Sequence, residues 1–150
     1  MTKTQPSIPI LMAEDDDGDR FFARKAAEKN AIPNPLVVVQ NGEELLDYLH
    51  GRGKFDQGRA STAPPCFILL DLNMPRMDGR EALRLVKSDE RFKKIPVVIL
   101  TTSKAEEDIA NCYQMGANSY ITKPVDFDGL VEVFRSLKAY WLETVDLPIP

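Results

Sequence analysis

Short apolar runs rich in β-branched residues alternate along the whole chain with segments long enough to form helices. Apolar runs without polar alternation are typical of strands buried on both faces, as in parallel sheets that are covered by helices. The chain therefore predicts an α/β fold, a five-stranded parallel sheet with helices on both faces. The expected strands are Ile8–Ala13, Leu36–Val39, Cys66–Leu72, Ile95–Leu100 and Ser119–Thr122.

A helix is expected after each strand. The first helix is capped by Asp16 or Asp17 and ends near Asn30. Its inward face is expected to consist of Phe22, Ala23, Ala26 and Ala27. The other helices are expected over Glu43–Leu49, Arg80–Lys87, Ala105–Met115 and from about Phe127 past Trp141. The segment Gly51–Pro65 is rich in Gly, Arg, Ser and Pro and predicts a surface loop.

The composition fits one globular domain over residues 1–150, with an extension from about residue 142 to 150 and no separate output domain. A net charge of −4 argues against general attraction to nucleic acid or anionic membranes. No apolar run approaches the roughly 20 residues of a membrane span, and no secretory signal precedes the first strand, so a cytoplasmic protein is expected. Cys66 and Cys112 are expected to be reduced residues in or near the core.

Polar side chains follow the carboxyl ends of the first, third, fourth and fifth expected strands. Because crossovers between parallel strands are right-handed, these ends lie at one edge of the sheet, where ligands bind in open α/β folds. The residues brought to that edge are Glu14, Asp15, Asp71, Asn73, Thr101 and Lys123. No single local pattern predicts this site, and the convergence of the strand ends is the main argument for it.

The residue types at this edge indicate a divalent cation. Three carboxylates repel one another, and one lysine cannot neutralise them. Oxygen ligands without His or Cys favour Mg²⁺ or Mn²⁺. Such a site is suited to a phosphoryl group, with Asp71 as the in-line nucleophile, Thr101 as a hydrogen-bond donor and Lys123 as a charge partner.

These residues and their neighbours resemble a response regulator receiver domain over essentially the full chain. The matching segments are Glu14–Asp15, Asp71–Pro75 with Asp78–Gly79, Leu100–Thr102 and Ser119–Pro124. The resemblance implies a (βα)5 flavodoxin-like receiver fold. It also implies a phosphorylation switch that acts on no separate substrate and is therefore not an enzyme in the usual sense.

The resemblance implies a role for each acidic residue of the site. Asp71 is the implied phosphoacceptor and also a metal ligand. Asp15 is an implied direct ligand of Mg²⁺, and Glu14 acts mostly through water. The backbone carbonyl of Asn73 completes the implied protein ligands.

Further roles are implied for the residues that follow the last two strands. Thr101 hydrogen-bonds a phosphoryl oxygen, and Lys123 pairs with the phosphoryl group. Thr101 and Tyr120 form the implied switch, in which the aromatic ring turns inward when the threonine moves toward the phosphoryl group. The bond between Lys123 and Pro124 is implied to be cis.

Within this family, the chain is most similar to small stand-alone regulators that partner phytochrome histidine kinases of the cyanobacterial type. The residues behind this narrower resemblance are Asp78–Glu81, Ile95–Val98, Leu100–Ser103, Trp141–Val145 and the insertion Gly51–Pro65. It implies a histidine kinase as phosphoryl donor. The output is then a protein contact at the face formed by the fourth helix, the fifth strand and the fifth helix.

Two sets of residues are candidates for partner contacts. Phe21 is expected to point outward beside the site, where it either docks on the kinase or lies over a neighbouring loop. Tyr140 and Trp141 lie at the end of the last helix, which is expected to form a homodimer contact. The alternative is a tail that folds back on its own domain.

Three other classes of protein fit less well. A phosphatase of the haloacid dehalogenase type needs a general acid two residues after its nucleophile, where this chain has Asn73. A flavin-binding protein of similar topology needs a phosphate-binding loop after the first strand, and Glu14–Asp17 would repel that phosphate. A receiver that signals without phosphorylation is expected to lack at least one residue of the phosphorylation site. This chain has all four, Asp15, Asp71, Thr101 and Lys123.

Overall fold

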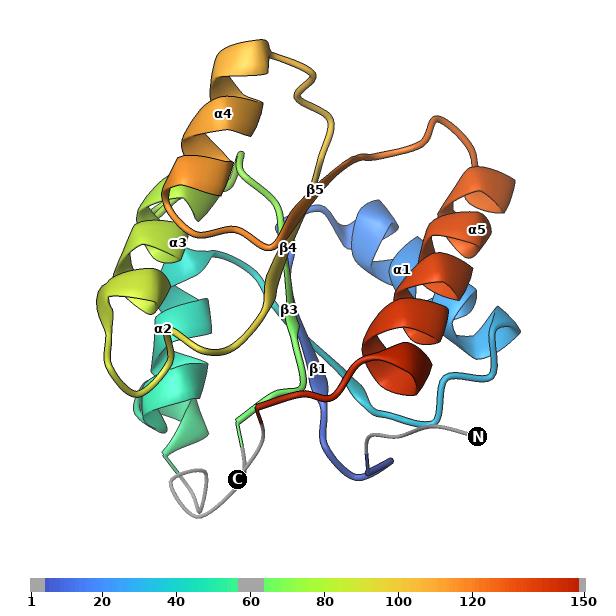
Figure 1. Ribbon diagram of the computed structural model, residues 1–150, viewed down its shortest axis with the longest axis horizontal. Helices are drawn as coiled ribbons and strands as arrows, with labels where there is room; N and C mark the ends of the chain where they lie inside the picture. The colour runs from blue at the N-terminus through green and yellow to red at the C-terminus, as the bar shows by residue number, and fades with distance from the viewer. Residues whose placement is uncertain (1–4, 57–63, 149–150) are drawn as a thin grey trace.

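The computed structural model describes residues 5–56 and 64–148. Within these residues, five strands form one parallel sheet in the order β2-β1-β3-β4-β5 (Figure 1). The bounds are β1 Ile10–Ala13, β2 Leu36–Val39, β3 Ile68–Leu70, β4 Val97–Thr101 and β5 Ser119–Thr122. The predicted five-stranded parallel sheet is confirmed.

Helices cover both faces of the sheet, as predicted. The first and last helices, α1 and α5, lie on one face, and α2, α3 and α4 lie on the other (Figure 1). The bounds are α1 Asp17–Lys29, α2 Gly42–His50, α3 Gly79–Ser88, α4 Glu106–Gln114 and α5 Phe127–Leu137. No helix in the described ranges is long and apolar enough to cross a membrane.

The segment Gly51–Pro65, predicted as a surface loop, contains a short 3₁₀ turn, η1 Gly53–Phe55. The ring of Phe55 contacts the ring of buried Tyr48, with centroids 5.3 Å apart. Residues 57–63 of this segment lie outside the described part of the chain. The beginning of the segment therefore packs against α2.

Two apolar cores lie on opposite faces of the sheet, because successive residues of a strand point to opposite sides. The core under α2, α3 and α4 includes Leu11, Leu70, Ile99, Leu45, Leu83 and Cys112. The core under α1 and α5 includes Met12, Leu69, Leu100, Ala26, Phe134 and Cys66. Both cysteines are free and buried, as the sequence predicted.

The first helix is capped by Asp16, one of the two alternatives that the sequence left open. A side-chain oxygen of Asp16 accepts a hydrogen bond from the backbone N–H of Asp19 at 2.8 Å. The three alanines of α1 are buried as predicted, but Phe22 is 46 % exposed, so its predicted inward position is wrong. The small alanine side chains fill the contact with the sheet, and Phe22 instead lies toward α5, where its ring centroid is 5.8 Å from that of Phe127.

The C-terminal helix continues past Trp141, as expected, but with a change of winding. After α5 the chain forms a π-helix, η3 Lys138–Thr144. Within η3, Leu142 is fully buried, and the Trp141 ring stacks on Phe67 with centroids 6.0 Å apart. Leu147 also packs against the core under α1 and α5. The start of the extension thus folds back on its own domain.

Candidate functional site

The register of the strands brings the predicted acidic residues together. Ala13 of β1 pairs with Leu70 of β3, so Glu14 and Asp71 leave neighbouring strands side by side. Oxygen atoms of Glu14, Asp15 and Asp71 all lie within 4.8 Å of one another. Glu14 and Asp71 are buried, whereas Asp15 is exposed. This set of oxygen donors fits a hard divalent cation that keeps part of its water shell.

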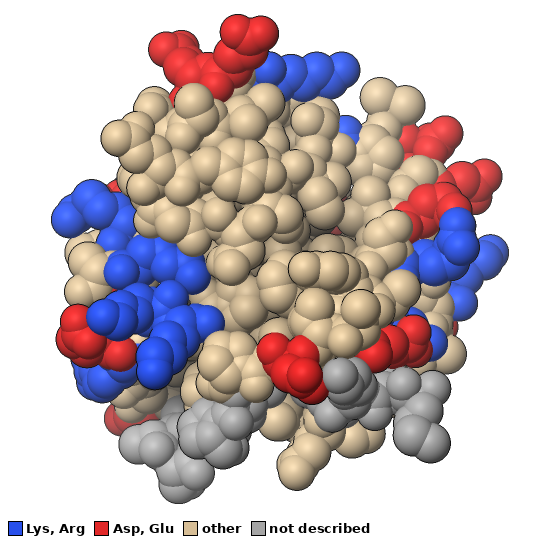
Figure 2. All heavy atoms as spheres, in the orientation of Figure 1, with Lys and Arg blue, Asp and Glu red and all other residues tan. Residues whose placement is uncertain are grey.

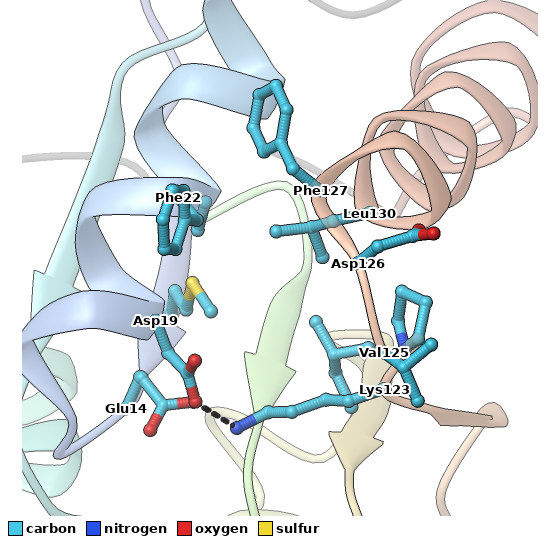
Figure 3. Close-up of a pocket in the computed structure, with 12 residues that line it drawn as sticks. Glu14, Asp19, Phe22, Lys123, Val125, Asp126, Phe127 and Leu130 are labelled. Carbon is cyan, nitrogen blue, oxygen red and sulfur yellow. Dashed lines mark hydrogen bonds and ion pairs between the residues drawn. The ribbon is translucent and has the colours of Figure 1, made fainter.

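Lys123 joins this acidic cluster from the end of β5. Its Nζ atom donates to Glu14 Oε1 at 2.6 Å, to Asp71 Oδ2 at 2.9 Å and to Asp19 Oδ2 at 2.9 Å. Figure 3 shows the lysine side chain reaching across the site toward the acids from β1 and α1. One ammonium group therefore serves three carboxylates, and Asp15 lies nearby as a fourth.

The buried charges of the site shift the pKa values of its groups. Burial raises the pKa of Glu14 from 4.5 to about 7, although its hydrogen bond to Lys123 acts in the opposite direction. Burial alone would lower the pKa of Lys123, but its hydrogen bonds to three carboxylates more than offset this and raise the pKa. Lys123 therefore stays charged, whereas burial makes Glu14 hold its proton more readily than an ordinary glutamic acid.

Thr101, the last residue of β4, presents a polar atom that is buried and unused. The residue is fully buried, and its Oγ1 atom has no hydrogen-bond partner among the described residues. The backbone of Thr101 is held beside the cluster, since its carbonyl accepts from Lys123 N at 2.7 Å. An unsatisfied buried hydroxyl costs about 1–3 kcal/mol, so a ligand that accepts a hydrogen bond from it is favoured here.

The backbone after Asp71 is shaped by the close approach of α3. A Cβ atom added at Gly79 would lie 2.0 Å from the carbonyl oxygen of Asp71, so only glycine fits. The Gly79 N–H donates to Leu72 O at 2.8 Å, and the preceding Asp78 caps α3 by accepting from the N–H groups of Arg80 and Glu81. Asp78 and Gly79 together fix the path of the loop that carries Asn73.

Asn73 and Tyr120 lie around this site. The backbone N–H of Asn73 is 3.4 Å from Asp71 Oδ1. The hydroxyl of Tyr120 donates to the carbonyl oxygen of Ser103 at 2.9 Å, and its half-buried ring packs against the core under α2, α3 and α4. Tyr120 is therefore attached to the loop that follows Thr101.

Asp19 is a site residue that the sequence analysis missed. The sequence assigns Asp16 and Asp17 as alternative helix caps and assigns Asp19 no role, yet Asp19 binds Lys123. The available signal was its position in the first turn of the helix, because helical side chains point back toward the N-terminus and so toward the end of β1. The sequence pattern alone could not distinguish it from the exposed Asp17.

A pocket of about 340 Å³ opens beside Lys123 between α1 and α5. Its lining contains three acids, Glu14, Asp19 and Asp126, and is otherwise mostly apolar. Phe22, Phe127 and Leu130 are the large apolar residues labelled in Figure 3. Phe21, on the neighbouring surface of α1, is 55 % exposed, as predicted. Its ring contacts that of Phe22 edge to face, with centroids 5.5 Å apart.

The peptide bond between Lys123 and Pro124 is trans, because the described residues contain no cis peptide bond. The expected cis bond is therefore wrong. The trans isomer is the intrinsically preferred one by about 0.5–1 kcal/mol. With this isomer, Lys123 still makes its backbone bond to Thr101 and all three of its side-chain bonds.

Comparison with known proteins gives consistent matches along the chain. Residues 10–135 match the family described as the response regulator receiver domain. Response regulator Rcp1 of Synechocystis sp. is 34 % identical over 97 % of this chain and 97 % of its own length.

Solved structures agree with this result. The crystal structure of the Mn²⁺-bound form of response regulator Rcp1 has a TM-score of 0.84 and 34 % identity, and the match covers 94 % of this chain and 99 % of that one. The crystal structure of the phosphorylated cyanobacterial phytochrome response regulator RcpA has a TM-score of 0.86 and 37 % identity, covering 95 % and 99 %.

Proposed function

The chain belongs to the response regulator receiver family, and from that premise we propose that Asp71 accepts a phosphoryl group from a histidine kinase in a Mg²⁺-dependent reaction. The observation that carries this proposal is the position of Asp71. Its carboxylate is buried, bound to Lys123 at 2.9 Å and adjacent to the carboxylates of Glu14 and Asp15.

The phosphoryl group moves from a nitrogen of the kinase histidine to an oxygen of Asp71. The P–N bond breaks as the P–O bond forms. The imidazole nitrogen, which is the leaving group, then takes up a proton. Lys123 pairs with the negative charge on the phosphoryl oxygens. Thr101 donates the hydrogen bond that its buried hydroxyl does not make elsewhere among the described residues.

Asp71, Asp15 and the backbone carbonyl of Asn73 are the proposed protein ligands of Mg²⁺ or Mn²⁺, with Glu14 acting mainly through a water molecule. The exposed position of Asp15 suits an ion that retains water. When bound, the ion neutralises charge on the phosphoryl group. In support, the related Rcp1 has been crystallised in a Mn²⁺-bound form.

The chemistry is limited to phosphorylation and dephosphorylation of Asp71 itself. Two residues after this nucleophile, Asn73 cannot act as the general acid that turnover of phosphoesters requires. The protein is therefore proposed to be a signalling protein. Its proposed location is the cytoplasm. Its donor is a histidine kinase of the phytochrome type, an assignment supported by similarity to RcpA.

The proposed switch connects Thr101 to Tyr120. Movement of Thr101 toward the phosphoryl group shifts the following loop, and the Tyr120 hydroxyl is bound to that loop at Ser103. The surface affected is the one over α4, β5 and α5, and Figure 2 shows that the middle of this face carries few charged side chains. A face with few charged side chains at its centre suits a protein partner.

Two partner contacts are also proposed, one for the kinase and one for a second copy of this chain. Phe21 is exposed and packs on Phe22, which lines the pocket next to Lys123, and Phe21 is the proposed contact for the kinase. Tyr140 is 53 % exposed and packs edge to face on Trp141, with centroids 4.9 Å apart. These two residues of the C-terminal helical region are the proposed centre of a homodimer contact.

The test of the phosphoacceptor is intact-mass spectrometry after incubation with acetyl phosphate and Mg²⁺. Wild type is expected to gain one phosphoryl group, whereas Asp71→Asn and a metal-free control are expected to gain none. An equal gain in Asp71→Asn would move the phosphorylation site elsewhere. No gain in wild type, with acetyl phosphate or with a phytochrome-type kinase, would refute the proposal.

A further inference from the structure

Arg80 forms a two-pronged link between α3 and α4. Its Nε and Nη2 atoms donate to Asp108 Oδ1 and Oδ2 at 3.1 and 3.0 Å. Arg80 lies in the first turn of α3 and Asp108 in the first turn of α4, on the same face of the sheet (Figure 1). Paired hydrogen bonds between a guanidinium and a carboxylate fix orientation as well as distance.

One end of this link leads to the phosphoacceptor. Arg80 Nη1 lies 3.5 Å from Asn73 Oδ1, and the N–H of Asn73 lies 3.4 Å from Asp71 Oδ1. Arg80 is also held over this loop by Asp78, whose Oδ2 is 3.6 Å from Nη1. The guanidinium thus rests against the loop whose carbonyl is a proposed metal ligand.

The other end leads to the loop after Thr101. Ser103 Oγ donates to Asp108 Oδ2 at 2.7 Å and accepts from Ala105 N at 3.3 Å. The carbonyl of the same serine accepts from the Tyr120 hydroxyl at 2.9 Å. The N-cap residue of α4, Ala105, offers no side-chain cap, so Asp108 and Ser103 fix the first turn of this helix.

A surface ion pair usually contributes little, and α3 contains one for comparison. Arg84 and Glu81 also form two hydrogen bonds, at 2.7 and 2.8 Å, but within a single helix. Their side chains are 55 % and 45 % exposed, against 36 % for Arg80 and 18 % for Asp108. The Arg80 link differs because it is less exposed and joins two loops that flank the site.

We propose that Arg80 is a positioning residue of the phosphorylation site, which holds the loop after Asp71 and the first turn of α4 in one arrangement through Asp108. This inference rests on the proposed function, since it concerns the same metal and phosphoryl site. Neither residue touches the reacting atoms. Their role is to keep Asn73 in place and to make α4 respond to events at Asp71.

The first measurement is the Mg²⁺ dissociation constant of the full chain by titration calorimetry. If the two residues acted only through their charge, the two substitutions would have opposite effects. Arg80→Gln would remove a positive charge and tighten Mg²⁺ binding, whereas Asp108→Asn would remove a negative charge and weaken it. If the two residues position the loop, as proposed, both substitutions weaken Mg²⁺ binding. We expect roughly 10-fold weaker binding in each, and no change in the control Arg84→Gln.

The double variant with Arg80→Gln and Asp108→Asn is expected to bind Mg²⁺ no more weakly than either single variant, because the two residues act as one link. If Arg80→Gln does not fold, Arg80→Lys keeps the charge without the paired geometry and is expected to show the same weakening. Opposite shifts in the single variants, or no shift in either, would overturn the proposal. Absence of Mg²⁺ binding in wild type would instead refute the proposed function.

The second measurement is hydrogen exchange over residues 103–112, with and without beryllofluoride, a stable analogue of the phosphoryl group, in the presence of Mg²⁺. Wild type and Arg84→Gln are expected to change their exchange in this segment on binding. Arg80→Gln, saturated with the analogue, is expected to lose most of that change. An equal change in Arg80→Gln would show that α4 responds to the site without this link.

Discussion

Substitution of Gly79 by alanine tests how closely α3 must approach the phosphorylation site. The new Cβ would lie 2.0 Å from the Asp71 carbonyl oxygen and 2.8 Å from Leu72 Cα, both of them backbone atoms. Relief requires a backbone shift, which costs about 1–3 kcal/mol in a packed region. The same shift weakens the bond from Gly79 N to Leu72 O, worth about 1 kcal/mol. The expected loss is therefore about 2–4 kcal/mol.

The assay is urea unfolding followed by circular dichroism, together with thermal unfolding, where this loss corresponds to a Tm lower by about 5–15 °C. The matched control is Gly18→Ala, also near the start of a helix. There the nearest atom to the new Cβ is a side-chain atom, the capping oxygen Asp16 Oδ2 at 3.1 Å, which needs to move by only a few tenths of an ångström. That variant is expected to be as stable as wild type or up to about 1 kcal/mol more stable. Equal unfolding free energies for the two variants would refute the reasoning.

Three further predictions concern buried polar groups. Thr101→Val replaces an unpaired hydroxyl by a methyl group and is expected to raise the free energy of unfolding in urea by about 1 kcal/mol. The same variant is expected to be phosphorylated more slowly by acetyl phosphate. A lower free energy of unfolding would mean that the hydroxyl has a hydrogen-bond partner. Lys123→Met leaves buried carboxylates without a positive partner and is expected to lower the free energy of unfolding in EDTA by about 3 kcal/mol. Mg²⁺ is expected to stabilise this variant more than it stabilises wild type, and equal stabilisation of the two proteins would contradict the prediction. Burial raises the pKa of the Cys66 thiol from 9.0 to about 12, so stability is expected to fall as the pH rises between these values, because the unfolded thiol ionises first. At pH 8, iodoacetamide is expected to alkylate Cys66 only after unfolding, and rapid labelling of the folded protein would contradict its burial.

The central site could be predicted from sequence because the parallel topology brings the carboxyl ends of the strands to one edge of the sheet. Once parallel strands are expected, Glu14, Asp71 and Lys123 must meet at one edge, whatever their separation along the chain. The same argument predicts two separate apolar cores. It works because strand ends occupy fixed places in this topology, so short segments of sequence carry long-range information.

The features that were missed depend on geometry that the pattern does not encode. Whether Asp19 faces Lys123 and whether Phe22 faces the sheet depend on the rotation of α1 about its axis, which three small alanines set. The contact of Arg80 with Asp108 joins two helices through side chains, and neither helix position has a distinctive local sequence. The π-helical winding of η3, in which Leu142 is fully buried, likewise has no distinctive pattern in the sequence.

The three bonds of Lys123 have a consequence for ligand binding at this site. Because the ammonium already satisfies Asp71, Glu14 and Asp19, any incoming ion or phosphoryl group must compete with an internal counterion. The binding free energy of Mg²⁺ or of a phosphoryl group at this site is then a difference. It is the free energy of the new contacts minus that of the Lys123 contacts that they replace. Stronger bonds from Lys123 to these carboxylates slow the reaction of Asp71 with phosphoryl donors other than its kinase. They also raise the Mg²⁺ concentration that is needed to fill the metal site.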